Sequence, residues 1–297
     1  MQILIYGAGV IGCLYGALFS ESGYDVTILA RGRRLESLAE NGLRYKSGST
    51  VKTAKVNVIG ELADTDNYDF VFVAVRENQL YAVLKALKCN ISPNIVTMVN
   101  SLDTYDKWEE ICGRGRIIPT FPGAGGGFDG DVLDAALTPG IIQPTTFAEI
   151  NGTRTERTKQ LAEIFRRSHI PYRIVADMHG WQLCHLAMVV PIADAYYETD
   201  VPEKAGCDMR LMQKTAKRIK RNLTILKNSG IPLLPTKMNL FLKLPVHELA
   251  FGLSLTFKSD FGDKFMYRHS MKAPDEMREL HRKFYAYLKG KKTDEKC

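Results

Sequence analysis

The sequence predicts an α/β protein with a doubly wound, Rossmann-type N-terminal domain followed by an all-α C-terminal domain. Three observations support this prediction. Short apolar segments alternate with helical segments in the first part of the chain, a glycine-rich turn joins the first strand to the first helix, and the last part has helical spacing throughout. We place the boundary near residue 170, with a dinucleotide-binding domain at 1–170 and a helical substrate or dimerisation domain at 171–297.

The expected elements follow from hydrophobic periodicity and from turn residues. The strands are expected at Gln2–Tyr6, Val26–Ala30, Val56–Ile59, Phe70–Val75, Ile95–Val99 and Ile117–Phe121. The helices are expected at Ile11–Ser22, Arg34–Asn41, Gln79–Lys88, Asp177–Tyr197, Cys207–Ser229, Pro245–Leu255 and Pro274–Leu288. The segment Phe70–Val75 is apolar at every position, which is typical of a parallel strand buried on both faces. Strands and helices that alternate with short connections indicate right-handed crossovers.

Composition excludes several classes of protein. The chain has 297 residues, 45% of them hydrophobic and 25% charged, which is ordinary for a globular protein. Its apolar stretches are far shorter than the roughly 20 residues of a membrane span, and its first residues lack a basic leader region. We expect a cytoplasmic protein without a membrane partner. The six cysteines have no C-x-x-C spacing and the histidines no metal-ligand spacing, so we expect reduced thiols and no metal.

The net charge of +7 is unevenly distributed. Residues 1–170 carry 18 basic and 19 acidic side chains, whereas residues 171–297 carry 22 and 14. Such a basic part can indicate nucleic-acid binding. The cations from Lys214 to Lys227 instead follow an amphipathic helical pattern without aromatic residues among them, so we favour a solvated helix face that attracts small anions.

The turn Gly7-Ala8-Gly9-Val10-Ile11-Gly12 predicts a dinucleotide site, because it lies between the first strand and the first helix. The first glycine permits a tight turn, the second lets a diphosphate approach the backbone, and the third lets the helix pack on the strand. The phosphates then lie at a helix N-terminus.

Arginines follow the second strand, where an NAD site usually has an acidic residue that binds the ribose hydroxyls. Arg31, Arg33 and Arg34 stand there, and a guanidinium group matches a 2′-phosphate. The alternative is a solvated arginine loop. We therefore expect NADP(H) as the cofactor. Arg76 and Asn100 follow later strands and are also candidate ligands of the cofactor or substrate, although each could be an ordinary loop residue.

These motifs resemble those of the ketopantoate reductase (2-dehydropantoate 2-reductase) family. The resemblance includes the glycine turn, Arg31, Gln79, Asn100 in the family's Q-N-G position, and Glu149–Gly152 in a G-E-x-x-G-like turn. Trp181 and the segment 228–232 are similar to the family's second half. The resemblance implies a Rossmann domain with an all-α domain, and NADPH-dependent reduction of a 2-keto acid.

The sequence departs from the family where the acid–base chemistry is expected. Arg76 stands in place of a lysine, and the family's C-terminal Glu-Ile-Asp segment is missing. The family's catalytic lysine follows the tryptophan by two residues, and asparagines follow on the same helix face. In this chain the corresponding positions hold Leu183, Ala187 and Pro191, or Gln182, Leu186 and Val190 if the match is shifted by one residue.

Another side chain must then supply the proton that a reduced carbonyl requires. His185 lies on the helix that carries the lysine in the relatives, but it points about 200° away from Leu183. His269 and Glu276 lie near the missing C-terminal segment, and could share a face if one helix included both. A structural role is an open alternative for each. Pro274 favours a helix that begins there, which would place Glu276 near the positive end of its dipole.

These observations predict an NADPH-dependent oxidoreductase that reduces a small 2-keto or imino acid other than ketopantoate. Its partner would be a small anionic substrate rather than nucleic acid or membrane, and a homodimer is left open. The alternative is a non-catalytic NADP(H)-binding sensor or scaffold that lost its chemistry with the lysine. A third hypothesis is an opine-type dehydrogenase. The glycine run 123–127 is expected to be a flexible turn or lid.

Overall fold

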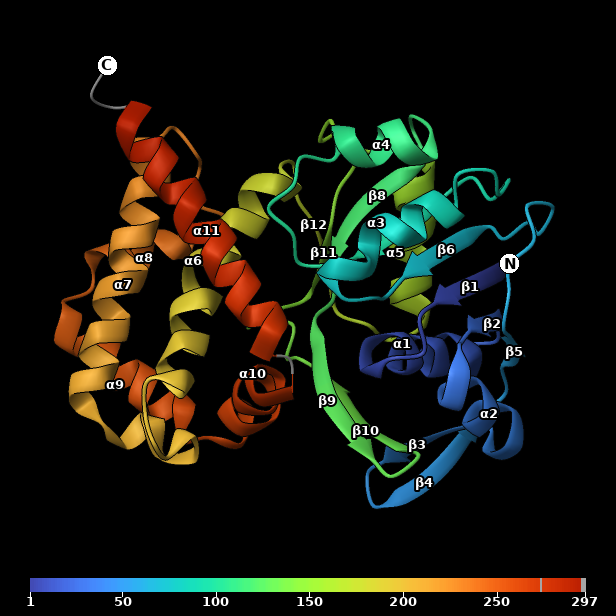
Figure 1. Ribbon diagram of the computed structural model, residues 1–297, viewed down its shortest axis with the longest axis horizontal. Coiled ribbons are helices and arrows are strands. Elements are labelled where there is room, and N and C mark those ends of the chain that lie inside the picture. Colours follow the sequence, from blue (N-terminus) through green and yellow to red (C-terminus); the bar gives the residue numbers. More distant parts are fainter. Residues whose placement is uncertain (273, 295–297) are drawn as a thin grey trace. The chain divides into compact units, whose positions relative to one another are not determined.

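The chain divides into two compact units, Met1–Met178 and His179–Cys297, in a computed structural model that describes residues 1–272 and 274–294 (Figure 1). The side chains of His269 and of residues 292–294 are outside this description. The first unit continues beyond residue 170, where we placed the boundary, because its last strand, β12 (Tyr172–Ile174), pairs with β11 (Thr145–Phe147).

The first unit is built on a mostly parallel sheet. Within the described residues this sheet has eight strands in the order β12-β11-β8-β7-β6-β1-β2-β5. The other strands are β8 (Ile117–Phe121), β7 (Ile95–Met98), β6 (Phe70–Val73), β1 (Gln2–Tyr6), β2 (Asp25–Leu29) and β5 (Asn57–Ile59). Strands β8 to β5 run parallel to one another, and β11 is antiparallel to β8. The predicted doubly wound sheet is confirmed.

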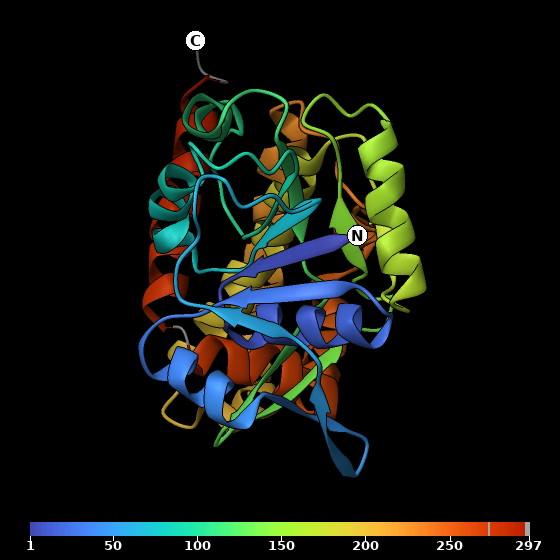
Figure 2. The ribbon, with the colours of Figure 1, turned by 90° about the vertical axis from the view of Figure 1, so that its right-hand side faces the viewer.

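Helices cover both faces of this sheet, as Figure 2 shows with α5 on one side and α3 and α4 on the other. The helices of the first unit are α1 (Val10–Glu21), α2 (Gly32–Asn41), α3 (Glu77–Ala86), α4 (Asp106–Cys112) and α5 (Glu156–Arg167). Aromatic rings join α1 and α5 to the sheet, because Phe19 lies 4.9 Å from Phe72 and 6.2 Å from Phe165 between ring centres. This buried cluster holds α1 and its glycine turn against the central strands.

A second sheet was not predicted. Its described strands follow the order β4-β3-β10-β9, with β4 (Thr50–Ala54), β3 (Leu43–Ser47), β10 (Val132–Leu137) and β9 (Ala124–Asp129). Three glycines of the run at 123–127, which we expected to be a flexible turn or lid, lie in β9, so that expectation was wrong for Gly125–Gly127. Gly126 pairs with Ala135, and a Cβ there would lie 2.3 Å from the carbonyl oxygen of Asp134. The glycine therefore permits a close antiparallel pair.

The second unit is helical, as predicted. Its helices are α6 (Met178–Tyr197), α7 (Met209–Asn228), α8 (Met238–Lys243), α9 (Val246–Phe257), α10 (Arg268–Lys272) and α11 (Pro274–Asp294), together with a 3₁₀ segment (Pro202–Cys207) and a π segment (Gly262–Tyr267). Helix α6 continues through Pro191, which has no N–H for the carbonyl of Ala187. Asn222 of α7 donates to that carbonyl at 3.3 Å and so satisfies it. No described helix combines the length and apolar character that crossing a bilayer requires.

Candidate functional site

The turn between β1 and α1 has the backbone that its glycines predict. Gly7 has a φ of +117°, and a Cβ there would lie 2.6 Å from the carbonyl oxygen of Ala74. A Cβ at Gly12 would lie 2.0 Å from the carbonyl oxygen of Gly7, so α1 can begin close to β1 only with glycine at this position. A Cβ at Gly9, the N-cap residue of α1, meets nothing within 4 Å. The space at Gly9 therefore has room for a phosphate beside the first N–H groups of α1.

Ala8, Val10 and Ile11 complete this turn and are half-buried. Two arginines after β2 are exposed near it. Arg31 is the N-cap residue of α2, and its Nη2 atom donates a hydrogen bond to the hydroxyl of Tyr6 at 2.7 Å. Arg33 lies in the first turn of the same helix and is also exposed. Both side chains can therefore reach a ligand in solution.

Arg34 is held more firmly than the other two. Its Nε atom donates to the carbonyl oxygen of Ala8 at 3.3 Å, and its Nη2 atom lies 3.5 Å from the sulfur of Cys13. Its guanidinium carbon lies 4.3 Å from the centre of the Phe128 ring. Burial raises the pKa of the Cys13 thiol, although Arg34 acts in the opposite direction. Arg34 thus links α2 to the glycine turn and to β9.

Arg76 and Asn100 follow β6 and β7. Arg76 is the exposed N-cap residue of α3. Asn100 is half-buried, and within the described part of the chain its buried Oδ1 atom accepts no hydrogen bond. A buried acceptor without a donor costs about 1–3 kcal/mol. A ligand hydroxyl or amide at this position would remove that cost.

The loop that carries Asn100 is anchored on α3. The N–H of Asp103 donates to the hydroxyl of Ser101 at 3.1 Å, and the hydroxyl of Tyr81 donates to the Asp103 carboxylate at 2.8 Å. Burial and the neighbouring Asp103 carboxylate raise the pKa of Tyr81 to about 12, so this hydroxyl keeps its proton. These contacts position the asparagine at the end of β7.

The strand order brings these candidates to one edge of the sheet. Strands β7, β6, β1 and β2 are parallel neighbours, and their carboxyl ends carry Asn100, Arg76, the glycine turn and Arg31 respectively. At about 4.8 Å per strand, the four ends span about 14 Å. A dinucleotide binds along this edge in doubly wound folds. The open position at Gly9, the exposed cations and the unsatisfied Asn100 oxygen fit such a ligand.

The candidate proton donors lie on helices of the second unit. His185 lies on α6, is 6% exposed, and stacks on Trp181 with ring centres 5.2 Å apart and planes 7° apart. The side chain of His269, on α10, lies outside the described residues. Glu276 is half-buried in α11. His269 lies in the described helix α10 and Glu276 in α11, and residue 273 between these helices lies outside the described residues, so a shared face of the two side chains stays a prediction.

The positions that the resemblance assigns to the family's lysine and asparagines are buried in both registers. The six residues at these positions are Leu183, Ala187, Pro191, Gln182, Leu186 and Val190, and only Gln182 among them is polar. Helix α6 is apolar on nearly all sides, which is typical of a core helix.

An ionisable pair in the second unit was missed by the sequence analysis. The side chain of Asp194 is 9% exposed. Its Oδ1 atom lies 2.7 Å from Nδ1 of His281, and its Oδ2 atom lies 3.9 Å from Nη1 of Arg218. Burial raises the pKa of Asp194, while His281 and Arg218 act against that rise. A carboxylate within an apolar helix was the available signal, because such a group needs a partner. Its partner is 87 residues away, so no local spacing could identify it.

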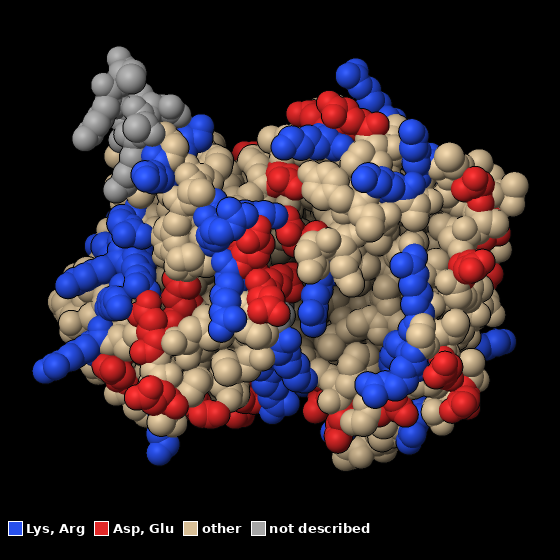
Figure 3. Space-filling model, viewed as in Figure 1, with Lys and Arg blue, Asp and Glu red and all other residues tan. Residues whose placement is uncertain are grey.

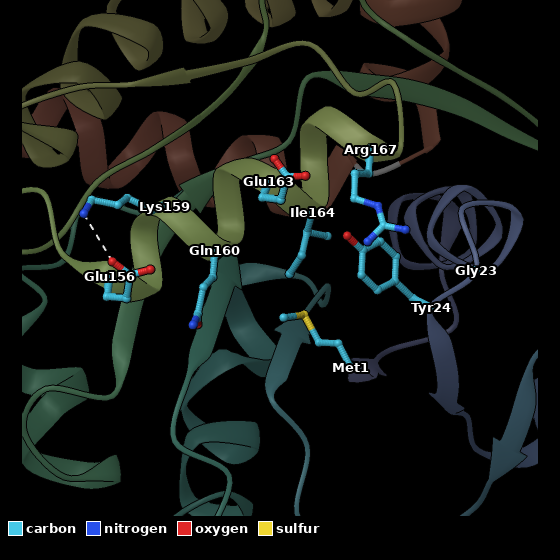
Figure 4. A pocket seen from close by; sticks show the side chains of 9 residues that line it. All are labelled: Met1, Gly23, Tyr24, Glu156, Lys159, Gln160, Glu163, Ile164 and Arg167. Carbon is cyan, nitrogen blue, oxygen red and sulfur yellow. Dashed lines mark hydrogen bonds and ion pairs between the residues drawn. The ribbon is translucent and has the colours of Figure 1, made fainter.

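The hollow drawn in Figure 4 lies away from the glycine turn. It has a volume of about 440 Å³ and lies at the amino ends of β1 and β2, where Arg167 packs over the ring of Tyr24 at 5.4 Å. Its lining residues are Met1, Gly23, Tyr24, Glu156, Lys159, Gln160, Glu163, Ile164 and Arg167. Among the described side chains, no three His, Cys, Asp or Glu residues are grouped so as to hold a metal ion.

Comparison with known proteins agrees with this geometry. The model of the family described as ketopantoate reductase PanE/ApbA matches residues 3–131, which include the glycine turn, the arginines and Asn100. Residues 3–131 are a ketopantoate reductase PanE/ApbA family domain. The domain therefore contains every cofactor ligand that we expected.

Relatives with known sequences and structures extend the comparison. An uncharacterised oxidoreductase of Bacillus subtilis, YkpB, is 30% identical over 174 residues, which are 56% of this chain and 54% of that protein. The chain spans little more than half the length of the curated relatives matched first. A PanE/ApbA family ketopantoate reductase structure from Ralstonia eutropha has a TM-score of 0.67 at 16% identity and covers 98% of this chain and 100% of its own.

A structure of D-mandelate dehydrogenase with NADH and anilino(oxo)acetate is also similar. It has a TM-score of 0.60 at 15% identity, and the match covers 98% of this chain and 99% of that one. At these identities the two structures establish the fold: an α/β Rossmann-type unit followed by a helical unit, as in ketopantoate reductases.

Proposed function

We propose that this protein is an NADP(H)-dependent oxidoreductase that reduces a small 2-keto or imino acid other than ketopantoate. The observation that carries the proposal is the row of candidate ligands at the carboxyl ends of β7, β6, β1 and β2. The family domain at residues 3–131 supports it, as do solved neighbours that are named for keto-acid reduction or bind NADH. A cytoplasmic location and a small anionic substrate, rather than nucleic acid or membrane, belong to the same proposal.

Each group at this edge has a role in the proposal. The N–H groups that follow Gly9 bind the diphosphate, and Arg31 with Arg33 binds the 2′-phosphate of the adenosine ribose. Arg34 holds the turn through the carbonyl of Ala8. Asn100 accepts a hydrogen bond from the far end of the dinucleotide or from the substrate. The nicotinamide ring, when bound, supplies the hydride.

Hydride addition to a carbonyl leaves an alkoxide that needs a proton. Our candidate donors are His185, His269 and Glu276. The stacking of His185 on Trp181 fixes the plane of its ring, which is useful for a directed donor but equally stabilises a core. Arg76 is the candidate for the carboxylate of the substrate, because it is exposed and a guanidinium binds a carboxylate bidentately.

The second candidate function is a non-catalytic NADP(H)-binding protein. This candidate is favoured by Leu183 and Ala187, which are buried at the lysine and asparagine positions in one register of the match. Neither side chain can donate a proton. The two functions share the cofactor site and differ only in turnover.

Calorimetry with NADPH and NADH tests the cofactor site, and we expect NADPH to bind more tightly. Removing a charge-assisted hydrogen bond costs about 1.5–3 kcal/mol, so Arg31→Ala should weaken NADPH by about 10- to 150-fold and NADH much less. Equal weakening of both would refute the 2′-phosphate role. No heat with either nucleotide would refute the whole proposal.

Turnover is then measured with NADPH and a panel of 2-keto acids, each with and without added amino acids. Oxidation of NADPH by a keto acid alone supports the reductase. A requirement for the amino acid indicates an opine-type dehydrogenase. Tight binding without turnover of any substrate supports the non-catalytic function.

A further inference from the structure

A basic groove lies along α7 in the second unit. It is a hollow of about 300 Å³ on one face of this helix, and its residues are Arg210, Gln213, Lys214, Lys217, Arg218 and Arg221. Basic side chains gather over α7 in the space-filling view (Figure 3). The groove residues recur every three or four positions, so they occupy successive turns and extend over about 16 Å at 1.5 Å per residue.

Part of the groove is held in place by acidic residues beneath it. Glu198 pairs with Lys214 at 2.9 Å and with Arg218 at 2.6 Å, and Arg218 also lies 3.9 Å from the buried carboxylate of Asp194. Arg221 lies over the ring of Tyr285 at 5.4 Å. These three cations are therefore oriented before any ligand arrives, which lowers the entropy cost of binding.

The other cations of the groove are not neutralised. Arg210 and Lys217 are exposed. Among the described residues, the ion pairs of α7 within 4.0 Å are those of Lys214 and Arg218, and neither Arg210 nor Lys217 takes part in one. Lys220, on another face of the same helix, provides a contrast. Its ammonium group donates to the carbonyl oxygens of Leu242 and Leu244 at 2.7 and 2.6 Å. The protein thus satisfies the inward cation of α7 and leaves two outward ones available.

We propose that this groove binds a small, multiply charged phosphate compound, such as an organic di- or triphosphate. Arginine forks bind phosphate oxygens bidentately. Clustered cations with few acidic partners create a local potential that favours multiply charged anions over a single carboxylate. The hollow is at the lower end of the size range for small-molecule pockets.

The groove suits a small phosphate compound better than single-stranded nucleic acid. Proteins that bind single strands combine cations with exposed aromatic rings on which bases stack. The groove itself is lined by no aromatic residue among the described side chains, and Arg221 lies over the adjacent ring of Tyr285. The site therefore offers phosphate contacts without base contacts.

Calorimetry of the full chain with inorganic triphosphate at about 50 mM salt tests the proposal. The variant Arg210→Gln/Lys217→Gln removes the two unpaired cations, and the control Lys227→Gln/Lys243→Gln removes two exposed cations outside the groove. We expect the first variant to bind triphosphate about 10- to 100-fold more weakly than the wild-type protein does. The control should retain wild-type affinity within about twofold. Thermal melting checks that both variants are folded.

Five results would overturn the proposal. Triphosphate fails to bind the wild-type protein, or the first variant keeps wild-type affinity. Both double variants weaken equally, which indicates a diffuse charge effect. A single-stranded oligonucleotide binds through Arg210 and Lys217 more tightly than triphosphate, which assigns the groove to nucleic acid. Arg31→Ala separates the groove from the glycine turn: unchanged triphosphate affinity supports the groove, and a loss places the anion at the turn and refutes it.

Discussion

Two glycine substitutions in one turn should separate ligand binding from stability. Gly9 has φ −79° and ψ −173°, which any residue adopts, and its Cβ would stand in open space. Gly9→Ala should therefore change the free energy of unfolding by less than about 1 kcal/mol. The added methyl group occupies the position through which the diphosphate approaches the backbone, so we expect dinucleotide affinity to fall by at least about tenfold.

Gly12→Ala should instead lower the stability of the fold. Its Cβ would lie 2.0 Å from the carbonyl oxygen of Gly7 and 2.9 Å from Cγ2 of Ile5, a fully buried residue of β1. Relief of the first contact requires α1 to move away from β1 by more than about 1 Å, and overpacking of this kind costs about 1–3 kcal/mol. At about 2–4 °C per kcal/mol for a unit of this size, the melting temperature should fall by about 2–12 °C.

Both effects are measured by thermal melting and by calorimetry with NADPH. Gly252→Ala is the matched control, because Gly252 is exposed on α9 and its Cβ would meet nothing within 4 Å. A glycine replaced by alanine in a helix should stabilise slightly and leave binding unchanged. The reasoning is refuted if Gly9→Ala binds NADPH like the wild-type protein, or if Gly12→Ala melts at the wild-type temperature.

Two further predictions concern stability. Burial raises the pKa of Glu149, but hydrogen bonds that include one from Arg157 at 2.8 Å outweigh burial and lower it below 4.5. Glu149→Gln should thus destabilise the protein by about 2 kcal/mol at pH 7, since it weakens charge-assisted hydrogen bonds, and this difference should narrow as the pH falls below about 4.5. Denaturant titrations that show a constant difference would contradict this. Asn222→Leu should lower the free energy of unfolding by about 1–3 kcal/mol, because it leaves the Ala187 carbonyl without a donor. The loss should be smaller in a protein that also carries Pro191→Ala, because the new backbone N–H at position 191 can bond that carbonyl. Equal losses in the two backgrounds would contradict this role of Asn222.

The main sheet was predictable because its strands are continuous apolar segments. Phe70–Val73 is buried at all four positions, so the sequence needs no polar alternation there and the pattern is unambiguous. The second sheet had no such signal. Most of β4 is exposed, and β9 begins with Ala124 and three glycines, which are depleted in strands. Leu133 of β10 pairs with Tyr45 of β3, a contact between distant segments that local spacing does not encode.

The same distinction applies to the site. The glycine turn acts through its backbone, and backbone conformation is determined by a few adjacent residues, so Gly7 to Gly12 could be predicted from the sequence. The contacts of Arg34 with Phe128 and of Asp194 with His281 each join residues far apart in the chain. Burial of a carboxylate requires such a partner, but the sequence alone does not say which residue provides it.

This difference bears on the proposed function, in which a cofactor site is kept while the acid–base residue differs from the one that the family resemblance implies. Dinucleotide binding is spread over many backbone N–H groups and several cations, so no single substitution removes it. Proton donation depends on one side chain at one position. In the proposed function the lysine position falls at Leu183 or Gln182, both buried in α6, and the donor is lost there without a change in the sheet. Under the proposed function, NADPH affinity is therefore no measure of catalysis. Only turnover, compared between the wild-type protein and variants of His185 and Glu276, distinguishes a reductase with a relocated donor from a protein that binds the cofactor without using it.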